Sequence, residues 1–131
     1  MTTQIFVNLP VKDLQKSIDF FTRLGFTFNP QFTDENATCM IVSETSFVML
    51  LVESYFSTFI SKKICDTEKY TEVLVCISAE SRDKVDTMVR QAVEAGGTTP
   101  RPSKDYGFMY QHGFQDLDGH LWELVYMEPT P

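Results

Sequence analysis

The sequence predicts an α+β fold in which one order of elements, a strand, a helix and then three strands, occurs twice. Apolar residues with strand spacing and with helix spacing follow one another in the same order in both halves of the chain. Glycines end the helical segment of each half. At 131 residues and 43% hydrophobic content, the chain suits one compact domain, so we expect two modules that share a core.

The first module is expected at residues 1–55 and begins with an apolar strand at residues 5–9. Pro10 closes this strand, because the residue before a proline avoids the helical region. Asp13 can cap the following helix, whose apolar residues recur at helical spacing until Gly25 ends it. The three remaining strands of the module are expected at residues 26–28, 38–43 and 47–52.

The second module is expected at residues 71–127, after a connection at residues 56–70. Its helix is capped by Ser78 or Ser81 and presents Val85 and Val89 on one face before Gly96 ends it. The motif that predicts a turn most strongly is Asp-Leu-Asp-Gly at residues 116–119, where a glycine suits a left-handed backbone. The strands are expected at residues 72–78, 98–99, 109–115 and 121–126.

The charge and the cysteine content of the chain indicate which partners it can bind and in which cellular compartment it is found. Lys and Arg total 11 against 18 Asp and Glu, a net charge of −7, so nucleic acid and anionic membranes would be repelled. Cys39, Cys65 and Cys76 are odd in number and widely spaced, which indicates reduced thiols. The apolar run at residues 47–52 is too short to cross a bilayer, and no basic leader is seen. We expect a cytoplasmic protein that binds neither nucleic acid nor membrane.

Two segments carry a resemblance to a known family. The first reads Phe-Val-Asn-Leu-Pro-Val-Lys-Asp-Leu at residues 6–14, followed by Ser-Ile-Asp-Phe-Phe at 17–21 and Leu-Gly-Phe at 24–26. The second reads Phe-Gln-Asp-Leu-Asp-Gly-His-Leu-Trp-Glu-Leu at residues 114–124. Over nearly the whole chain, the order of elements and these motifs resemble the vicinal oxygen chelate superfamily of glyoxalases, bleomycin resistance proteins and extradiol dioxygenases. The run at residues 107–127 is similar to a bacterial subgroup labelled as predicted lactoylglutathione lyases.

The resemblance implies one domain at residues 1–131 in which two βαβββ modules form curved mixed sheets around a cavity. This is the glyoxalase/bleomycin resistance/dihydroxybiphenyl dioxygenase fold. It also implies a homodimer, because such modules pair their open sheets within one chain or across two chains. Either pairing is compatible with this sequence.

The resemblance also identifies four inward strand positions that supply His, Gln or Glu to a metal in metal-using members. Here they fall on Phe6, Met49, Glu72 and Glu123, with Glu72 uncertain by one position. Phenylalanine has no lone pair, and the soft thioether of methionine does not suit Ni, Zn, Fe or Mg ions. We therefore expect no tightly bound metal, although a divalent metal held by an incomplete ligand set is an alternative.

Glu123 is the candidate catalytic residue, because an unpaired charge within Leu-Trp-Glu-Leu-Val would be costly to bury. Two hairpin registers are open. In the one we prefer, Gly119 takes a left-handed bulge position, Gly113 lies opposite Glu123, and Gln111 shares its inward face. In the other register, His112 lies across from Glu123 and forms an acid/base pair with it.

The predicted ligand contacts come from both modules. With Phe6 inward, strand alternation also turns Asn8 into the cavity, where Met49, Glu72 and Gln111 complete the expected substrate-binding set. His120 adjoins the turn, so we expect it to face solvent or to cap the turn. The arginines are expected on helices, or on a loop for Arg101, with none facing the cavity; this argues against a glutathione substrate, which presents two carboxylates.

Two functions are compatible with these residues. The first is a glyoxalase-like lyase or isomerase that transfers a proton next to the carbonyl of a small oxygenated substrate, with Glu123 as the base. The second is a non-catalytic protein that sequesters a small molecule or antibiotic, as bleomycin resistance proteins do. The acidic charge and a cavity lined by Phe6, Met49 and Tyr106 or Phe108 would then suit a cationic, aromatic ligand.

Overall fold

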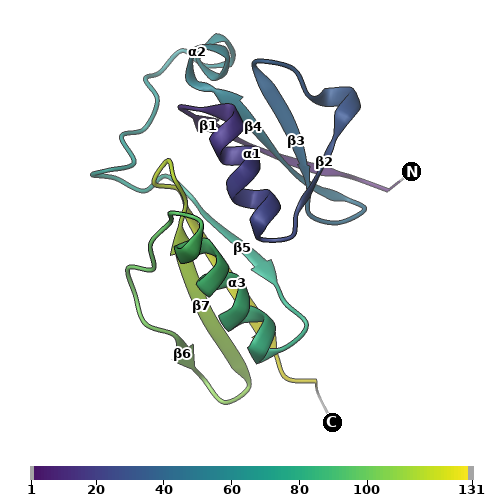
Figure 1. Cartoon of the computed structure of the whole chain (residues 1–131), viewed down its shortest axis with the longest axis vertical. Helices are drawn as coiled ribbons and strands as arrows, with labels where there is room; N and C mark the ends of the chain where they lie inside the picture. The colour runs from purple at the N-terminus through teal and green to yellow at the C-terminus, as the bar shows by residue number, and fades with distance from the viewer. Residues whose placement is uncertain (1, 130–131) are drawn as a thin grey trace. The chain divides into compact units, whose positions relative to one another are not determined.

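The computed structural model describes residues 2–129 and has the predicted α+β architecture. The chain divides into two compact units, Met1–Ile64 and Cys65–Pro131. Each unit contains one four-stranded mixed sheet and one helix of ten or more residues that packs on it (Figure 1). None of the helices in residues 2–129 combines the length and the apolar character that a bilayer crossing requires.

The first unit has the predicted order of one strand, one helix and three strands. Its sheet has the order β1-β4-β3-β2, with β1 parallel to β4 and the other pairs antiparallel. Two short helical turns, α2 (Glu53–Phe56) and η2 (Ser57–Phe59), follow the sheet. The bounds are β1 (Ile5–Val11), α1 (Leu14–Arg23), β2 (Thr27–Asn29), η1 (Pro30–Phe32), β3 (Ala37–Ile41) and β4 (Ser46–Val52).

The first strand is longer than predicted, because β1 continues through Pro10 to Val11. The sheet order makes β1 an edge strand that pairs with β4 alone, and an edge strand tolerates the missing amide proton of a proline. The cap was predicted correctly: the Asp13 carboxylate accepts a hydrogen bond from the Lys16 amide and α1 begins at Leu14.

The second unit repeats this order, with the sheet β5-β8-β7-β6 and β5 parallel to β8. Of the two predicted caps for α3, Ser81 is the one used, since its hydroxyl accepts from the Lys84 amide. Val85 and Val89 are buried where α3 lies against β7 and β8. The bounds are β5 (Leu74–Ser78), α3 (Arg82–Glu94), β6 (Lys104–Asp105), β7 (Met109–Gln115) and β8 (Leu121–Met127).

Two predicted strands of this unit are corrected. Residues 98–99 form no strand; Thr98 makes an isolated bridge to Gln115, and pairing resumes only at β6. Pro100 and Pro102 lie between the bridge and β6, and prolines lack the amide proton that a strand ladder needs. The strand predicted from Glu72 begins at Leu74 instead, so Glu72 precedes the sheet.

The turn between β7 and β8 is built around the buried carboxylate of Asp116, which is 6% exposed. One carboxylate oxygen accepts from the amides of Asp118 and His120 at 2.9 and 3.0 Å, and the other accepts from Trp122 Nε1 at 2.9 Å. Burial raises the pKa of Asp116, while nearby His120 and these donors oppose the rise. His120 is itself 8% exposed, so of its two predicted roles, facing solvent is wrong, while its backbone amide takes part in the turn through its bond to Asp116.

We expect Asp116→Asn to lower the free energy of unfolding by about 1–3 kcal/mol, because the amide NH₂ would face the indole N–H of Trp122 and leave a buried donor unpaired. Urea unfolding followed by circular dichroism measures the loss. In a double-mutant cycle, the same change in a Trp122→Phe background should cost less, because the conflicting donor is gone. Equal costs in the two backgrounds would contradict this role of the indole.

Candidate functional site

The second unit carries a cleft of about 530 Å³ that contains Glu123. On β8, Trp122 and Leu124 are 1% exposed and lie on the α3 side, so strand alternation turns Leu121 and Glu123 to the opposite face. Leu121 and Leu74 contribute apolar lining. The cleft therefore contains the carboxylate of Glu123 beside apolar groups of β5 and β8.

The predicted hairpin register is confirmed. Gly113 lies opposite Glu123, and Gly119 has the left-handed φ of 83° that the bulged turn requires. A Cβ on Gly113 would stand 2.6 Å from the Trp122 carbonyl oxygen and 3.5 Å from Glu123 Cγ. Glycine at residue 113 thus lets the two strands approach and keeps the space beside the carboxylate open.

Gln111 holds the Glu123 side chain. Its amide nitrogen Nε2 donates a hydrogen bond to Glu123 Oε2, and both residues line the cleft. Among the contacts of residues 2–129, no donor reaches the second carboxylate oxygen, Oε1. The carboxylate is therefore oriented through one oxygen, and the other is left to accept a proton or a ligand donor.

The alternative register, with His112 across from Glu123, is wrong. His112 pairs with Leu124, and its ring is directed to groups other than Glu123. Nε2 lies 3.1 Å from the Thr99 hydroxyl, and Nδ1 lies 3.9 Å from the Asp86 carboxylate on α3. His112 borders the cleft but forms no acid/base pair with Glu123.

Two cations missed by the sequence analysis also line the cleft. Arg101 belongs to the loop before β6, and Lys104 is the first residue of β6, where it pairs with Gln111. Lys104 Nζ lies 5.0 Å from the centre of the Tyr106 ring. The expectation that no arginine faces the cavity is therefore wrong. Prolines on both sides of Arg101 indicate a stiff loop, but the sequence does not say which face that loop covers.

Cys76 lies beside Glu123, because the two residues are partners in the parallel pairing of β5 with β8. Burial raises the pKa of the Cys76 thiol, and the negative charge of Glu123 raises it further. The thiol therefore reports on the charge of the Glu123 carboxylate.

Two of the predicted contacts from the first module line a hollow within the first unit. They are Asn8 and Met49, and the hollow has a volume of about 360 Å³. Phe6 is 48% exposed, stacks on Phe47 with ring centres 4.9 Å apart, and lines neither hollow. Its backbone oxygen accepts from the Asn8 side chain, so part of the amide group of Asn8 is satisfied locally.

Glu72 does not take the role predicted for it. It is exposed, precedes β5 and lines neither the Glu123 cleft nor the hollow of the first unit. The residue nearest to the expected position within the sheet is Leu74, which lines the cleft with an apolar side chain. The cleft thus contains one carboxylate instead of the two that were expected.

The donor set does not fit a resident divalent metal. Of the four family positions, Phe6 and Met49 lack hard donor atoms and Glu72 is outside the sheet. Within residues 2–129, no three His, Cys, Asp or Glu side chains gather as a possible metal site. Glu123 is the one family position that keeps a suitable donor in a cleft.

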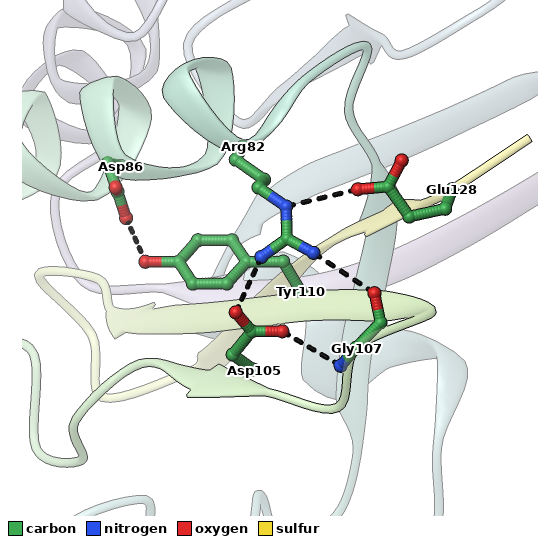
Figure 2. A network of polar contacts seen from close by, with 6 residues as sticks. All are labelled: Arg82, Asp86, Asp105, Gly107, Tyr110 and Glu128. Carbon is green, nitrogen blue, oxygen red and sulfur yellow. Dashed lines mark hydrogen bonds and ion pairs between the residues drawn. The ribbon is translucent and has the colours of Figure 1, made fainter.

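The far side of the same sheet fixes β6 and β7. Figure 2 shows the Arg82 guanidinium between the carboxylates of Asp105 and Glu128, with nitrogen to oxygen distances of 2.8 and 3.2 Å. The guanidinium also donates to the Gly107 carbonyl and lies over the Tyr110 ring. Asp105 and Tyr110 are partners in the pairing of β6 with β7, next to the pair of Lys104 and Gln111. Arg82 therefore stabilises the hairpin that places Lys104.

Comparison with known proteins agrees with this architecture. Residues 3–43 match the family described as bleomycin resistance protein-like N-terminal. The hypothetical protein SA1046 from S. aureus has a similar structure, with a TM-score of 0.79 and 30% identity over 96% of this chain and 95% of that one. No curated protein sequence matches this chain.

Two solved structures with lower identity share the fold. A glyoxalase/bleomycin resistance protein/dioxygenase family enzyme from Burkholderia phytofirmans PsJN superposes with a TM-score of 0.80, 14% identity, and 96% and 99% of the two chains covered. The fosfomycin resistance protein FosX from Listeria monocytogenes superposes with a TM-score of 0.68, 17% identity, and 96% and 93% covered. These structures show that the chain has the fold of glyoxalase/bleomycin resistance/dioxygenase proteins, and the match of residues 3–43 agrees with the resemblance carried by the opening motif.

We expect Arg82→Gln to loosen the β6–β7 hairpin, because Asp105, Glu128 and the Gly107 carbonyl all lose a charged donor. Hydrogen exchange should become faster at the amides of Tyr106 and Gly107, which bond to the Met109 carbonyl and to Asp105. Arg90→Gln, an exposed change on the same helix, is the matched control. Unchanged protection in the Arg82 variant would contradict this role.

We expect Glu123→Gln to shift the alkylation of Cys76 to lower pH. Removing the negative charge lowers the thiol pKa, so the reactive thiolate forms at a lower pH. Iodoacetamide labelling across a pH series, read by peptide mass spectrometry, gives the midpoint for each cysteine separately. The exposed Glu80→Gln is the control, and a midpoint that does not move in the Glu123 variant would count against a charged Glu123 beside Cys76.

Proposed function

We propose that this protein is a glyoxalase-like enzyme that transfers a proton next to the carbonyl of a small oxygenated substrate. Glu123 is the general base, and the reaction is of the lyase or isomerase type. The observation that carries the proposal is the Glu123 carboxylate in the cleft, which Gln111 holds through one oxygen while the other accepts no hydrogen bond from residues 2–129.

The chemistry follows from this arrangement. Oε1 of Glu123 takes the proton from the carbon next to the substrate carbonyl, and the bonding electrons move onto the carbonyl oxygen as an enolate. In a substrate with a hydroxyl on the carbon that lost its proton, the hydroxyl proton passes to the enolate oxygen and the protonated Glu123 returns its proton to the former carbonyl carbon. The hydroxyl-bearing carbon becomes the new carbonyl, which completes an isomerisation. A general base must reach the proton it removes within hydrogen-bond distance, and the open space beside Gly113 allows a ligand to come that close.

The enolate oxygen needs stabilisation without a resident metal, because the donor set does not fit one. Lys104 supplies a positive charge to the same cleft and pairs with Gln111, which itself holds Glu123. A cation placed near developing negative charge in a site with apolar walls contributes more than it would in water. We assign Lys104 this stabilising role.

A second function is non-catalytic sequestration of a small molecule. The match of residues 3–43 to a bleomycin resistance protein-like family favours it, as does the mixture of apolar and aromatic groups around the cleft. Sequestration needs affinity but no base, so the two functions differ in their dependence on Glu123. The homodimer expected from the resemblance stays a prediction under either function.

Deuterium exchange tests the enzymatic proposal without knowledge of the product. In heavy water, the protein should catalyse exchange of the hydrogens next to the carbonyl of hydroxyacetone, methylglyoxal or pyruvate, as followed by proton NMR. Glu123→Gln should reduce the catalysed rate by about 10²-fold or more, since positioned acid–base groups contribute on this scale.

Controls separate catalysis from simple binding. Glu80→Gln should exchange at the wild-type rate, because Glu80 is exposed and lines neither the Glu123 cleft nor the hollow of the first unit. Exchange that survives in Glu123→Gln would overturn the role of this residue. Saturable binding of these compounds with no catalysed exchange in the wild type would favour sequestration.

A further inference from the structure

We propose that the Glu123 cleft selects substrates that carry an oxyanion, a carboxylate or a phosphonate, and that Arg101 is the residue that binds it. This inference rests on the proposed function for the identity of the reacting end. It adds a substrate class and a specificity-determining residue, neither of which the sequence analysis anticipated.

The charges of the cleft are opposite to those of the chain. The protein as a whole has a net charge of −7, yet the charged side chains lining the cleft are two cations, Arg101 and Lys104, and one anion, Glu123. A local excess of one sign in a cleft with low-dielectric walls attracts ligands of the other sign. The cationic ligand expected from the overall charge is therefore disfavoured at this site.

Arg101 is free to bind a ligand. Among residues 2–129, no carboxylate pairs with its guanidinium, whereas the guanidinium of Arg82 is occupied by Asp105 and Glu128. An arginine fork matches the two oxygens of a carboxylate or phosphonate and can bind them through two parallel hydrogen bonds. An unpaired guanidinium at a cleft in an acidic protein is thus better suited to a ligand than to a structural ion pair.

The loop that carries Arg101 is attached to the strand that faces Glu123. Pro100 and Pro102 restrict the backbone on both sides of the arginine. The Thr99 hydroxyl lies 2.8 Å from the Gly113 carbonyl oxygen and 3.3 Å from that of Arg101. Gly113 is the residue opposite Glu123, so Thr99 connects the Arg101 loop to the part of β7 beside the base.

These charges determine how a ligand would lie in the cleft, with its oxyanion at one end and its reacting carbon at the other. An oxyanion next to Glu123 would be repelled, and in the proposed function Lys104 stabilises the enolate oxygen. We therefore place the oxyanion at Arg101, which leaves the carbon that loses its proton near Glu123. A cleft of about 530 Å³ is within the range that holds small ligands, and it accommodates both ends of such a molecule. The substrate class that fits is a short oxo or hydroxy acid, or the corresponding phosphonate.

Binding measurements test this inference separately from catalysis. Pyruvate and acetylphosphonate are the carboxylate and phosphonate probes, and pyruvamide is the neutral control of similar size. Wild-type protein, titrated by isothermal calorimetry or NMR, should bind at least one oxyanion more tightly than pyruvamide. Arg101→Gln should weaken that binding by about tenfold or more, the scale of a lost charge-assisted hydrogen bond, and leave pyruvamide binding unchanged.

Two further variants separate the possible outcomes. Arg90→Gln, an exposed change on α3, should bind the oxyanion as the wild type does. Glu123→Gln should bind it at least as tightly as the wild type, because a repelling charge is removed. Oxyanion binding that depends on Arg101, together with absent proton exchange, would uphold this inference and refute the proposed function.

Three binding results would contradict oxyanion selection by Arg101. Equal affinity for pyruvate, acetylphosphonate and pyruvamide, or no measurable binding of either oxyanion, would overturn it. Unchanged affinity in Arg101→Gln would overturn it as well, even if Glu123 proves to be the base. The probe that loses more affinity in Arg101→Gln identifies the oxyanion for which the cleft is built.

Discussion

Asp116 accepts three hydrogen bonds at the end of β7, and the placement of the candidate base depends on them. Two of the donors are amides of the turn, and the third is the indole of Trp122 on β8. Because side chains alternate along a strand, fixing Trp122 beneath α3 turns its neighbour Glu123 to the other face. A slip of one residue would bury the carboxylate and expose the indole. The buried turn carboxylate therefore determines which residue faces the cleft.

The two faces of the sheet of the second unit have different roles: one carries stabilising contacts and the other lines the cleft. Toward α3, Arg82, Asp105 and Tyr110 form a polar network that holds β6 and β7 (Figure 2). Toward the cleft, Gln111 donates a hydrogen bond to Glu123 and pairs with Lys104 of β6. The charges that stabilise the fold are thus paired with one another, while Arg101 is left for a ligand. The ion pairs of Arg82 with Asp105 and Glu128 stabilise β6 and β7 on the α3 face, so the Arg101 guanidinium is not needed for an ion pair that stabilises the fold.

The sequence predicted those features that local patterns determine. The order of elements, the Asp13 cap, and the register that sets Gly113 against Glu123 follow from apolar spacing and turn residues. Features that depend on packing between distant segments were missed. Nothing local indicates that Asp116 and His120 are buried together, or that the loop holding Arg101 folds over the cleft. Strand ends were also misjudged, because β5 begins two residues after the predicted Glu72.

Net charge misleads about the ligand for a physical reason. It sums over the whole surface, whereas a ligand senses charges within about one Debye length, roughly 8–10 Å in physiological salt. Carboxylates elsewhere on the chain are screened, so the two cations and one carboxylate of the cleft decide the local preference. The same three charges also meet the needs of proton transfer next to a carbonyl. In the proposed reaction, the carboxylate of Glu123 takes the proton and Lys104 stabilises the enolate, which leaves Arg101 to bind the far end of the substrate.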